Sequence, residues 1–190
     1  MDTEELKSIL NFIRKSEGLK NTIRSGHTST GRAESVAEHT WRLCLMALML
    51  EKGFPGVDIS RVIKICIVHD LGEAINGDIP APSQTDSGDK SESERKDLLQ
   101  LVDCLPDQLQ KEIVALWDEY EEASTAEAKT AKALDKLETI MQHNQGKNPE
   151  NFDYAFNLDY GKKYTSDHPV ISSIRQILDE ETRKLADKSE

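Results

Sequence analysis

The sequence predicts an all-α protein, for three reasons. Apolar residues recur at the spacing of amphipathic helices in nearly every segment. No segment offers several runs of alternating, β-branched residues, which strands would require. The 190 residues include 37% hydrophobic side chains, and neither an internal repeat nor a low-complexity linker divides them. We therefore expect a compact single-domain helical bundle over residues 1–190.

The first two predicted helices are separated by a polar stretch. In the first helix, apolar residues from Leu6 to Ile13 share one face. Residues 20–35 contain glycines and hydroxyl side chains and are interpreted as a loop. Ser35, with Glu38 three residues later, forms a capping box that opens the next helix. That helix is nearly all apolar up to Gly53, so we expect it to be buried on most sides.

Asp58 is expected to cap a third helix that continues through residues 59–75. Residues 76–91 are rich in Gly, Pro and Ser, which predicts a loop, and this loop is the segment we expect to move most.

Helical patterns resume in three successive segments, residues 93–105, 106–123 and 124–143. Ser124 and Glu127 form a second predicted capping box at the start of the last one. A break rich in Gly, Asn and Pro precedes a short aromatic segment, residues 152–161. The final helix, about residues 169–184, is expected to pack on a core formed by residues 19–145.

Charge and cysteine content restrict the partners and the compartment. The formal net charge of −11 repels polyanions, which excludes a nucleic acid polymer as a long-lived partner. No apolar stretch reaches the roughly 18–20 residues that span a membrane. Three scattered cysteines without CxxC spacing, and an N-terminal segment unlike a signal peptide, predict a reducing, cytoplasmic location.

The stretch "CIVHDLGEAINGD", residues 66–78, places charged residues against a buried segment. His69 and Asp70 follow an apolar run directly, and Glu73 and Asp78 come within the next two turns. Ionisable groups so close to a core are unfavourable unless something compensates their charge. A bound metal ion would do so.

Two further residues complete a candidate ligand set. His39 lies in the first turn of the second helix, and Asp135 lies at the edge of an apolar stripe in "KALDKLE". Alone, His39 would more often be a partly buried histidine and Asp135 a solvated residue. Together with His69 and Asp70 they offer nitrogen and oxygen ligands, which suit Mn²⁺, Co²⁺, Fe²⁺ or Zn²⁺ better than Ca²⁺ or Mg²⁺. Such an ion can activate water for phosphoester hydrolysis.

This ordered set of His, then His-Asp, then Asp resembles the signature of the HD-domain metal-dependent phosphohydrolases. The resemblance extends from about Leu19 to Ile174 and is closest to the 5′-deoxynucleotidase branch (the HD-domain-containing protein 2 group). The stretches that carry it include "ESVAEHTWRLCLMALML", "VIKICIVHDLGEAINGDIP" and "STAEAKTAKALDKLE". It implies a helical bundle around one metal, commonly a homodimer, with the metal held by the four residues His39, His69, Asp70 and Asp135.

The resemblance also implies roles for residues near the metal. Glu73 and Asp78 match the acidic pair that positions water and transfers protons, and the assignment of base and acid between them stays open. Arg24 matches an arginine that contacts the substrate, and Arg32 is a second candidate for the phosphate. Relatives carry a tryptophan close after this arginine, whereas this chain has "RSGH", so His27 either fills that space or is an ordinary loop histidine. The missing tryptophan leaves the preference for deoxyribose open.

The predicted function is hydrolysis of (deoxy)ribonucleoside 5′-monophosphates, small-molecule nucleotides, to nucleoside and phosphate. Two alternatives remain at this point. The chain could hydrolyse another nucleotide phosphoester, or it could be a metal-binding regulatory protein without catalysis. The presence of Glu73 and Asp78 beside the ligands argues against the second alternative, because a purely structural metal site has no need of them.

Overall fold

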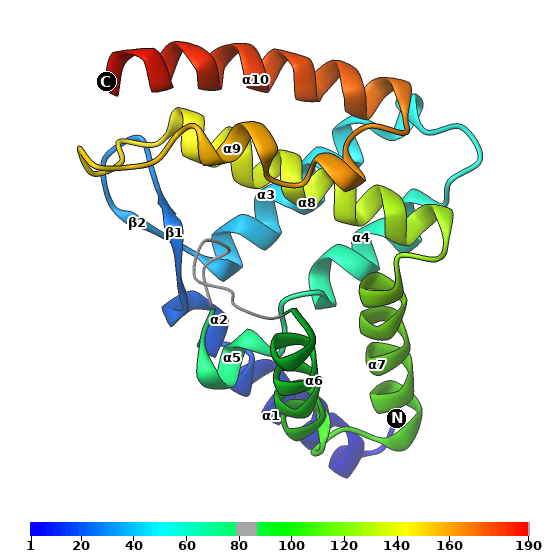
Figure 1. Ribbon diagram of the computed structural model, residues 1–190. Coiled ribbons are helices and arrows are strands. Elements are labelled where there is room, and N and C mark those ends of the chain that lie inside the picture. Colours follow the sequence, from blue (N-terminus) through cyan, green and yellow to red (C-terminus); the bar gives the residue numbers. More distant parts are fainter. Residues whose placement is uncertain (79–86, 190) are drawn as a thin grey trace.

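The structure, a computed structural model, describes residues 1–78 and 87–189 and confirms the all-α class, with one small hairpin added (Figure 1). The hairpin is a two-stranded antiparallel sheet. In chain order the elements are α1 (Thr3–Lys15), α2 (Gly18–Asn21), β1 (Ile23–His27), β2 (Ala33–Ser35), α3 (Val36–Met49), η1 (Glu51–Gly53), α4 (Ile59–Val68), α5 (Glu73–Asn76), α6 (Ser87–Val102), α7 (Asp107–Glu122), α8 (Ala126–Gln145), α9 (Phe156–Asp159), η3 (Lys162–Tyr164) and α10 (Pro169–Ser189).

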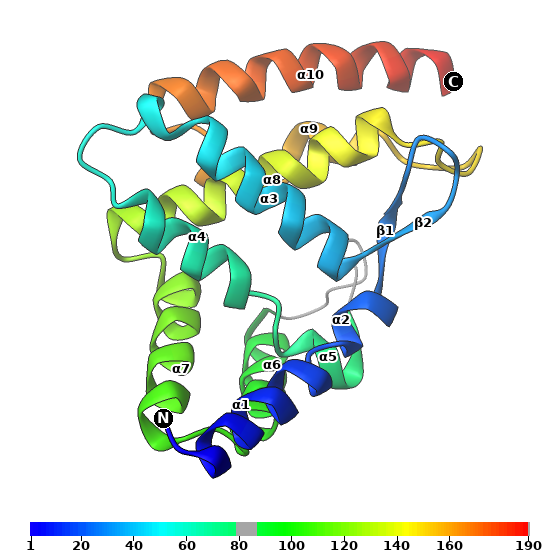
Figure 2. The same ribbon diagram turned by 180° about the vertical axis from the view of Figure 1, so that it is seen from behind.

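Three helices, α3, α4 and α8, cross at the centre of the molecule and contact one another (Figures 1 and 2). Their buried faces form much of the core, with Leu43, Ile65 and Leu137 all fully buried. The long helix α10 lies along α8 at one end, while α1, α6 and α7 lie at the other end. The central helices therefore have a fixed geometry relative to one another, and side chains at their crossing are held in place.

Local sequence signals set the starts of α3 and α4 as expected. The Ser35 side chain accepts from the Glu38 backbone N–H, and the Glu38 carboxylate accepts from the Ser35 N–H, which is the predicted capping box. Asp58 caps α4 by accepting from the Arg61 N–H. The predicted helix over residues 59–75 is shorter than expected, because α4 ends at Val68 and a separate turn, α5, follows.

The hairpin β1–β2 lies in the stretch that the sequence predicts to be a loop. Both strands are short and their pairing has a register irregularity. Neither strand shows the usual alternation of buried and exposed side chains. Long-range contacts hold it: Gln142 on α8 donates its side-chain N–H to the His27 carbonyl oxygen. A Cβ atom at Gly146 would collide with that same carbonyl, so only glycine permits this approach of α8 to the strand.

Two other predicted boundaries are wrong. The N-cap of α8 is Thr125, whose hydroxyl accepts from the Ala128 N–H, and not Ser124. Glu127 instead accepts from the Asp58 backbone N–H, so it connects α8 to the start of α4. The predicted loop over residues 76–91 ends earlier than expected, since α6 begins at Ser87. Residues 79–86 of that loop lie outside the described residues, so its expected mobility stays a prediction.

The second predicted helix is not buried on most sides. Along α3, Trp41, Leu48 and Met49 are exposed, while Val36, His39 and Leu43 face the core. The apolar face of α1 is partly exposed as well, at Leu6, Leu10 and Ile13. Within the described ranges, no helix has the length and apolar character that crossing a membrane requires.

Candidate metal centre and its cavity

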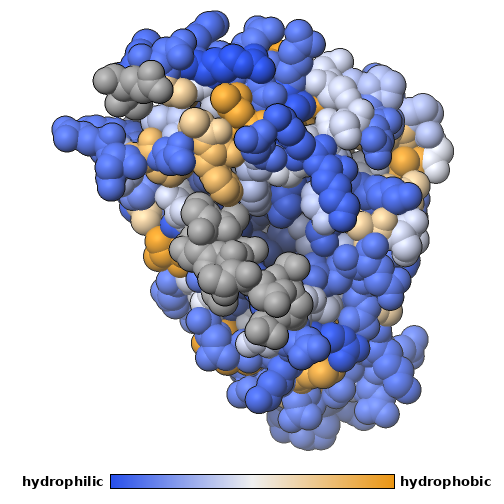
Figure 3. Space-filling model, viewed as in Figure 1, coloured by the Kyte–Doolittle hydropathy of each residue, from blue (hydrophilic) through white to orange (hydrophobic). Residues whose placement is uncertain are grey.

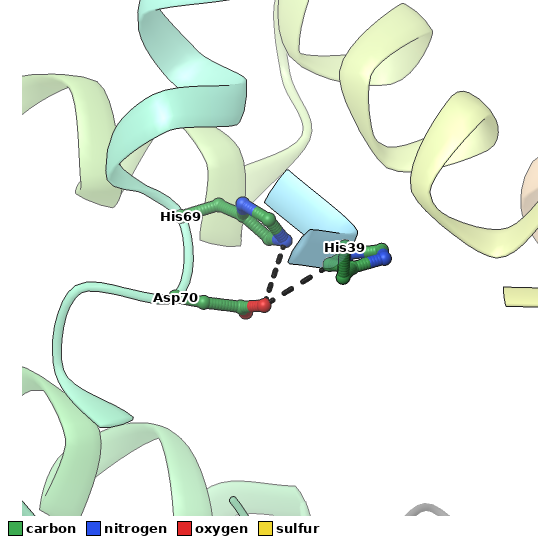
Figure 4. Close-up of side chains that lie close together, drawn as sticks. All are labelled: His39, His69 and Asp70. Atoms are coloured by element: carbon green, nitrogen blue, oxygen red, sulfur yellow. Dashed lines mark ion pairs between the residues drawn. The ribbon is translucent and has the colours of Figure 1, made fainter. Parts of the chain in front are cut away.

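Four predicted ligands converge where α3, α4 and α8 cross. His39 lies in the first turn of α3, His69 and Asp70 directly follow α4, and Asp135 lies midway along α8. The Asp70 Oδ2 atom is 3.1 Å from His69 Nε2 and 3.9 Å from His39 Nε2. Dashed lines mark these two ion pairs in Figure 4. Asp135 Oδ1 is 3.3 Å from the same His39 nitrogen. His39, His69 and Asp70 thus lie close enough together to share one ion, and Asp135, 96 positions after His39, approaches this group through the His39 ring.

The two imidazoles have the orientation that a metal ion requires. His69 Nδ1 lies 2.7 Å from the Cys66 carbonyl oxygen, to which it can only donate, and His39 Nδ1 pairs with a Glu138 oxygen. Each ring therefore turns Nε2 toward the two aspartates. Both Nε2 atoms are buried and make no hydrogen bond with the described residues. Two buried ring nitrogens without partners, facing two carboxylates, fit a divalent cation.

A network of buried charges fixes the orientation of His39. Glu138 is fully buried, and its second carboxylate oxygen accepts from Nε of Arg42 at 2.5 Å. Arg42 also approaches Glu34 at 3.7 Å. Burial and the nearby Glu138 raise the pKa of Glu34 to about 7. Arg42 is largely covered, and its guanidinium holds this network together.

Asp135 is held from the side opposite His39. Its Oδ2 accepts from the Tyr120 hydroxyl at 2.6 Å and lies 2.9 Å from the Lys136 ammonium. Burial opposes ionisation, but Lys136 and the two histidines keep the pKa of Asp135 well below its usual range. Asp135 is therefore a carboxylate, with Oδ1 directed to the centre of the site.

Glu73 and Asp78 lie beside the four predicted ligands. The Lys90 ammonium, from α6, lies 3.8 Å from each of these carboxylates and 3.2 Å from Glu94. Burial, together with the negative charges of Asp70 and Asp78, raises the pKa of Glu73 to about 10. Its buried Oε2 makes no hydrogen bond with the described residues. In the metal-free protein, Glu73 therefore holds a proton at neutral pH, despite the nearby Lys90 ammonium.

Arg24 reaches the centre from β1. Its Nη1 donates to Asp70 Oδ2 at 3.4 Å and its Nη2 donates to Thr139 Oγ1 at 3.1 Å. Burial disfavours the charge, but Asp70, Asp135 and other carboxylates raise the pKa of Arg24 beyond its normal value. The guanidinium is thus a permanent cation at the edge of the candidate metal centre.

His69, Asp70 and Asp135 line a cavity of about 340 Å³, whereas the fully buried His39 lies behind its wall. Figure 3 shows the cavity as a hollow in a mostly hydrophilic face. Glu73, Asp78 and Arg24 all line it. The other two predicted substrate residues have other contacts: the exposed Arg32 pairs with Glu38, and the backbone of His27 binds Gln142.

The cavity is also lined by residues outside the predicted set. Two of them, Thr139 and His143, follow the predicted ligand Asp135 at intervals of four along α8, so all three lie in one row on the helix. The sequence alone contains this signal, because residues four and eight positions after a candidate ligand on a helix lie on the same face as that ligand. Tyr120 and Lys90 had no comparable signal, because each reaches the cavity from a helix whose placement depends on tertiary packing.

Comparison with known proteins gives consistent results. The HD domain family matches residues 16–175. The 5′-deoxynucleotidase HDDC2 of Bos taurus is 36% identical over 147 residues, which cover 76% of this chain and 71% of that protein. The protein of the same name from Xenopus laevis is 32% identical over 190 residues, with 96% and 92% covered.

Solved structures agree with the fold. The crystal structure of a predicted metal-dependent phosphohydrolase from Magnetospirillum magnetotacticum MS-1 matches with a TM-score of 0.79 and 29% identity. That match covers 95% of this chain and 94% of the other. The PH0347 protein from Pyrococcus horikoshii OT3 matches with a TM-score of 0.69 and 26% identity, over 92% of this chain and 98% of that one. Since the family match spans most of the chain and relatives are similar over nearly their full length, this chain belongs to the HD domain family.

Proposed function

We propose that this chain hydrolyses nucleoside 5′-monophosphates, deoxyribonucleotides included, to nucleoside and inorganic phosphate, with a divalent metal as cofactor. The observation that carries this proposal is the convergence of two carboxylates on two imidazole nitrogens that make no hydrogen bond with the described residues, beside a protonated Glu73 and a buried Arg24. Relatives named 5′-deoxynucleotidase, at 30–36% identity, support the nucleotide as substrate class.

His39, His69, Asp70 and Asp135 would hold the ion. When bound, it offsets the negative charge of the phosphoryl group and makes a water molecule more acidic. The candidate metals are Mn²⁺, Co²⁺, Fe²⁺ and Zn²⁺, because nitrogen and carboxylate ligands accept all of them. The chain supplies the remaining parts of the reaction.

Arg24 would bind the phosphate. Its side chain is held by Asp70 and Thr139, so the guanidinium has a fixed position and offers charge-assisted hydrogen bonds to phosphate oxygens. A permanent cation at this point also favours an anionic substrate within a chain of net charge −11.

Glu73 and Asp78 would move the protons. Hydrolysis takes one proton from the attacking water and gives one to the leaving 5′-oxygen. Glu73 has a raised pKa and lies in the cavity, so it can hold a proton or accept one as its charge environment changes. Asp78 lies 3.8 Å from the same Lys90 ammonium and would serve as the counterpart of Glu73.

Three further features belong to the proposal. We expect a homodimer, supported by the exposed apolar side chains Trp41, Leu48 and Met49 of α3. We expect a single resident metal per chain. We expect a cytoplasmic location, supported by cysteines at positions 44, 66 and 104 that are free in the structure.

The test is phosphate release from the eight common ribo- and deoxyribonucleoside 5′-monophosphates, after chelation and readdition of single metals. Release that depends on one of the candidate metals supports the proposal. Turnover confined to other phosphoesters, such as cyclic nucleotides, would assign a different substrate. Metal binding without turnover of any phosphoester would contradict an enzymatic role. Light scattering on the same sample gives the oligomeric state.

A further inference from the structure

A second cavity opens beside the first and shares part of its wall. It has a volume of about 240 Å³ and lies between β1, the end of α8 and the segment before α9. Ser25, His143 and Phe156 line both cavities, so the two are adjacent. We call the part bounded by Ser25, His143, Phe152 and Phe156 the aromatic recess.

The position of the recess relative to the metal centre follows from α8. Asp135, Thr139 and His143 lie on one row of the helix, and each step of four residues advances about 6 Å. Arg24 binds Thr139, so the phosphate position lies near the first step. The recess begins at the second step, about 12 Å along the axis from Asp135. The sugar and base of a nucleotide extend from its phosphate over this range of distance.

Polar groups at the entrance of the recess match a hydroxyl group. His143 Nδ1 lies 2.8 Å from the Asn157 Oδ1 atom and donates to it, so its Nε2 is left as an acceptor. Ser25 Oγ lies 3.4 Å from that Nε2 and can donate to it, which leaves the serine oxygen free to accept. Burial lowers the pKa of His143, so the ring is neutral. With Nε2 of His143 occupied by the Ser25 hydroxyl, the serine oxygen is the acceptor that remains, and it favours a ligand that brings an O–H donor, as a sugar does.

The walls of the recess match an aromatic base. Phe152 packs edge-on against His143, with ring centroids 4.9 Å apart, and Phe156 is only partly buried. Figure 3 shows hydrophobic side chains over α9, on the rim of the hollow. Exposed aromatic rings stack well on bases of any type. The opposite end of the main cavity differs, because its charged side chains already pair, as Lys132 does with Glu121.

We propose that the aromatic recess binds the nucleoside of the substrate, with the base stacked between Phe152 and Phe156 and a sugar hydroxyl bound by Ser25, which His143 orients. This inference rests on the proposed function, since it takes the phosphate to lie at the metal centre. It identifies the recess as the part of the chain that distinguishes a nucleotide from a simple sugar phosphate.

The test compares two substrates of the full-length, metal-loaded protein: a deoxynucleoside 5′-monophosphate and deoxyribose 5-phosphate, which lacks the base. Phe152→Leu and Phe156→Leu should each reduce the preference for the nucleotide, as a ratio of kcat/KM values, by about tenfold. Tyr154→Leu is the matched control, because Tyr154 lies in the same segment and packs on Phe152 but does not line either cavity. It should retain the wild-type ratio.

The hydroxyl contact is tested separately. Ser25→Ala should raise KM for a 2′-deoxynucleotide by about fivefold and have no such effect with a 2′,3′-dideoxynucleotide, which lacks the donor. Melting temperature and metal content are measured for each variant, so loss of folding is distinguished from loss of recognition.

The possible failures have different readouts. A wild-type protein that hydrolyses neither substrate would overturn the proposed function itself. A protein that hydrolyses nucleotides, but whose preference survives Phe152→Leu and Phe156→Leu or is lost equally in Tyr154→Leu, would overturn only the assignment of the recess.

Discussion

Glu138 accepts a hydrogen bond from Nδ1 of His39, and both side chains are fully buried. A carboxylate in this position fixes which ring nitrogen carries a proton and turns the other toward the metal centre. Arg42 in turn holds the carboxylate of Glu138. The orientation of His39 therefore depends on a residue that would not touch the ion.

We predict that Glu138→Gln weakens metal binding by about tenfold to a hundredfold, because a neutral amide orients His39 less firmly and leaves Arg42 without its charged partner. Competition with a chromogenic chelator measures the affinity. Glu127→Gln, on the same helix but directed to the start of α4, serves as control and should bind metal as the wild type does. Equal affinity of Glu138→Gln and wild type would exclude the positioning role.

Metal binding should weaken as the pH falls. Burial and the Arg24 charge lower the pKa of His39, but Glu138 and Asp135 outweigh them and raise it to about 9 in the metal-free protein. At pH 7 the ring is therefore protonated, and a metal ion must displace one proton to bind. The apparent affinity should fall by about tenfold per unit below pH 9. Calorimetry in buffers of different ionisation enthalpy measures the released proton. A metal affinity that does not change between pH 6 and pH 8 would contradict the predicted proton release.

Asp70→Asn should reduce phosphate release by at least about a hundredfold, because it removes a charged ligand that both histidines face. The fold should survive, since Asp70 lies after the end of α4 and outside the apolar core. Circular dichroism checks the fold and a phosphate assay checks activity. Ordinary activity in the folded variant would remove Asp70 from the site.

Glu73→Gln should separate catalysis from metal binding. Glu73 lies beside the ligands, and its proposed task is proton transfer, which is typically worth about 10² to 10⁴ in rate. We expect kcat to fall within that range while KM and metal content change little. A variant that lost its metal along with its activity would show that Glu73 is a ligand instead.

Arg175→Lys should destabilise the segment that carries the aromatic residues. The buried Arg175 guanidinium, on α10, donates to the carbonyl oxygens of Asn157, Leu158 and Tyr160. Lysine cannot satisfy these acceptors together, and leaving buried acceptors unpaired costs about 1–3 kcal/mol each. Chemical denaturation should show a loss of about 2–4 kcal/mol. Lys188→Arg, at the end of the same helix, is a control that should be neutral.

The features predicted correctly from the sequence depend on short-range signals. The capping box of Ser35 and Glu38, and the cap at Asp58, act within one turn of helix. The grouping of His39 with His69 and Asp70 came from their order along the chain, and the structure places them together. Their role as metal ligands stays a prediction until an ion is bound and measured.

The features that were missed depend on partners far away in the sequence. Arg42 looks like an ordinary helix-surface arginine until α8 brings Glu138, 96 residues later, against it. Strand β1 has little strand character of its own, and its partner Gln142 lies 115 positions from His27. The exposed face of α3 has the same composition as a buried one, so apolar content alone could not show which side faces solvent.

The crossing of α3, α4 and α8 has a consequence for the whole domain. An ion held by the four predicted ligands would bind the folded chain and not the unfolded one, so the concentration of free metal would affect the folding equilibrium. At 100 times its dissociation constant it adds about 2.7 kcal/mol to the free energy of unfolding. The heat resistance of the protein and its lifetime against proteases will therefore follow the metal supply of its surroundings, even when no substrate is present.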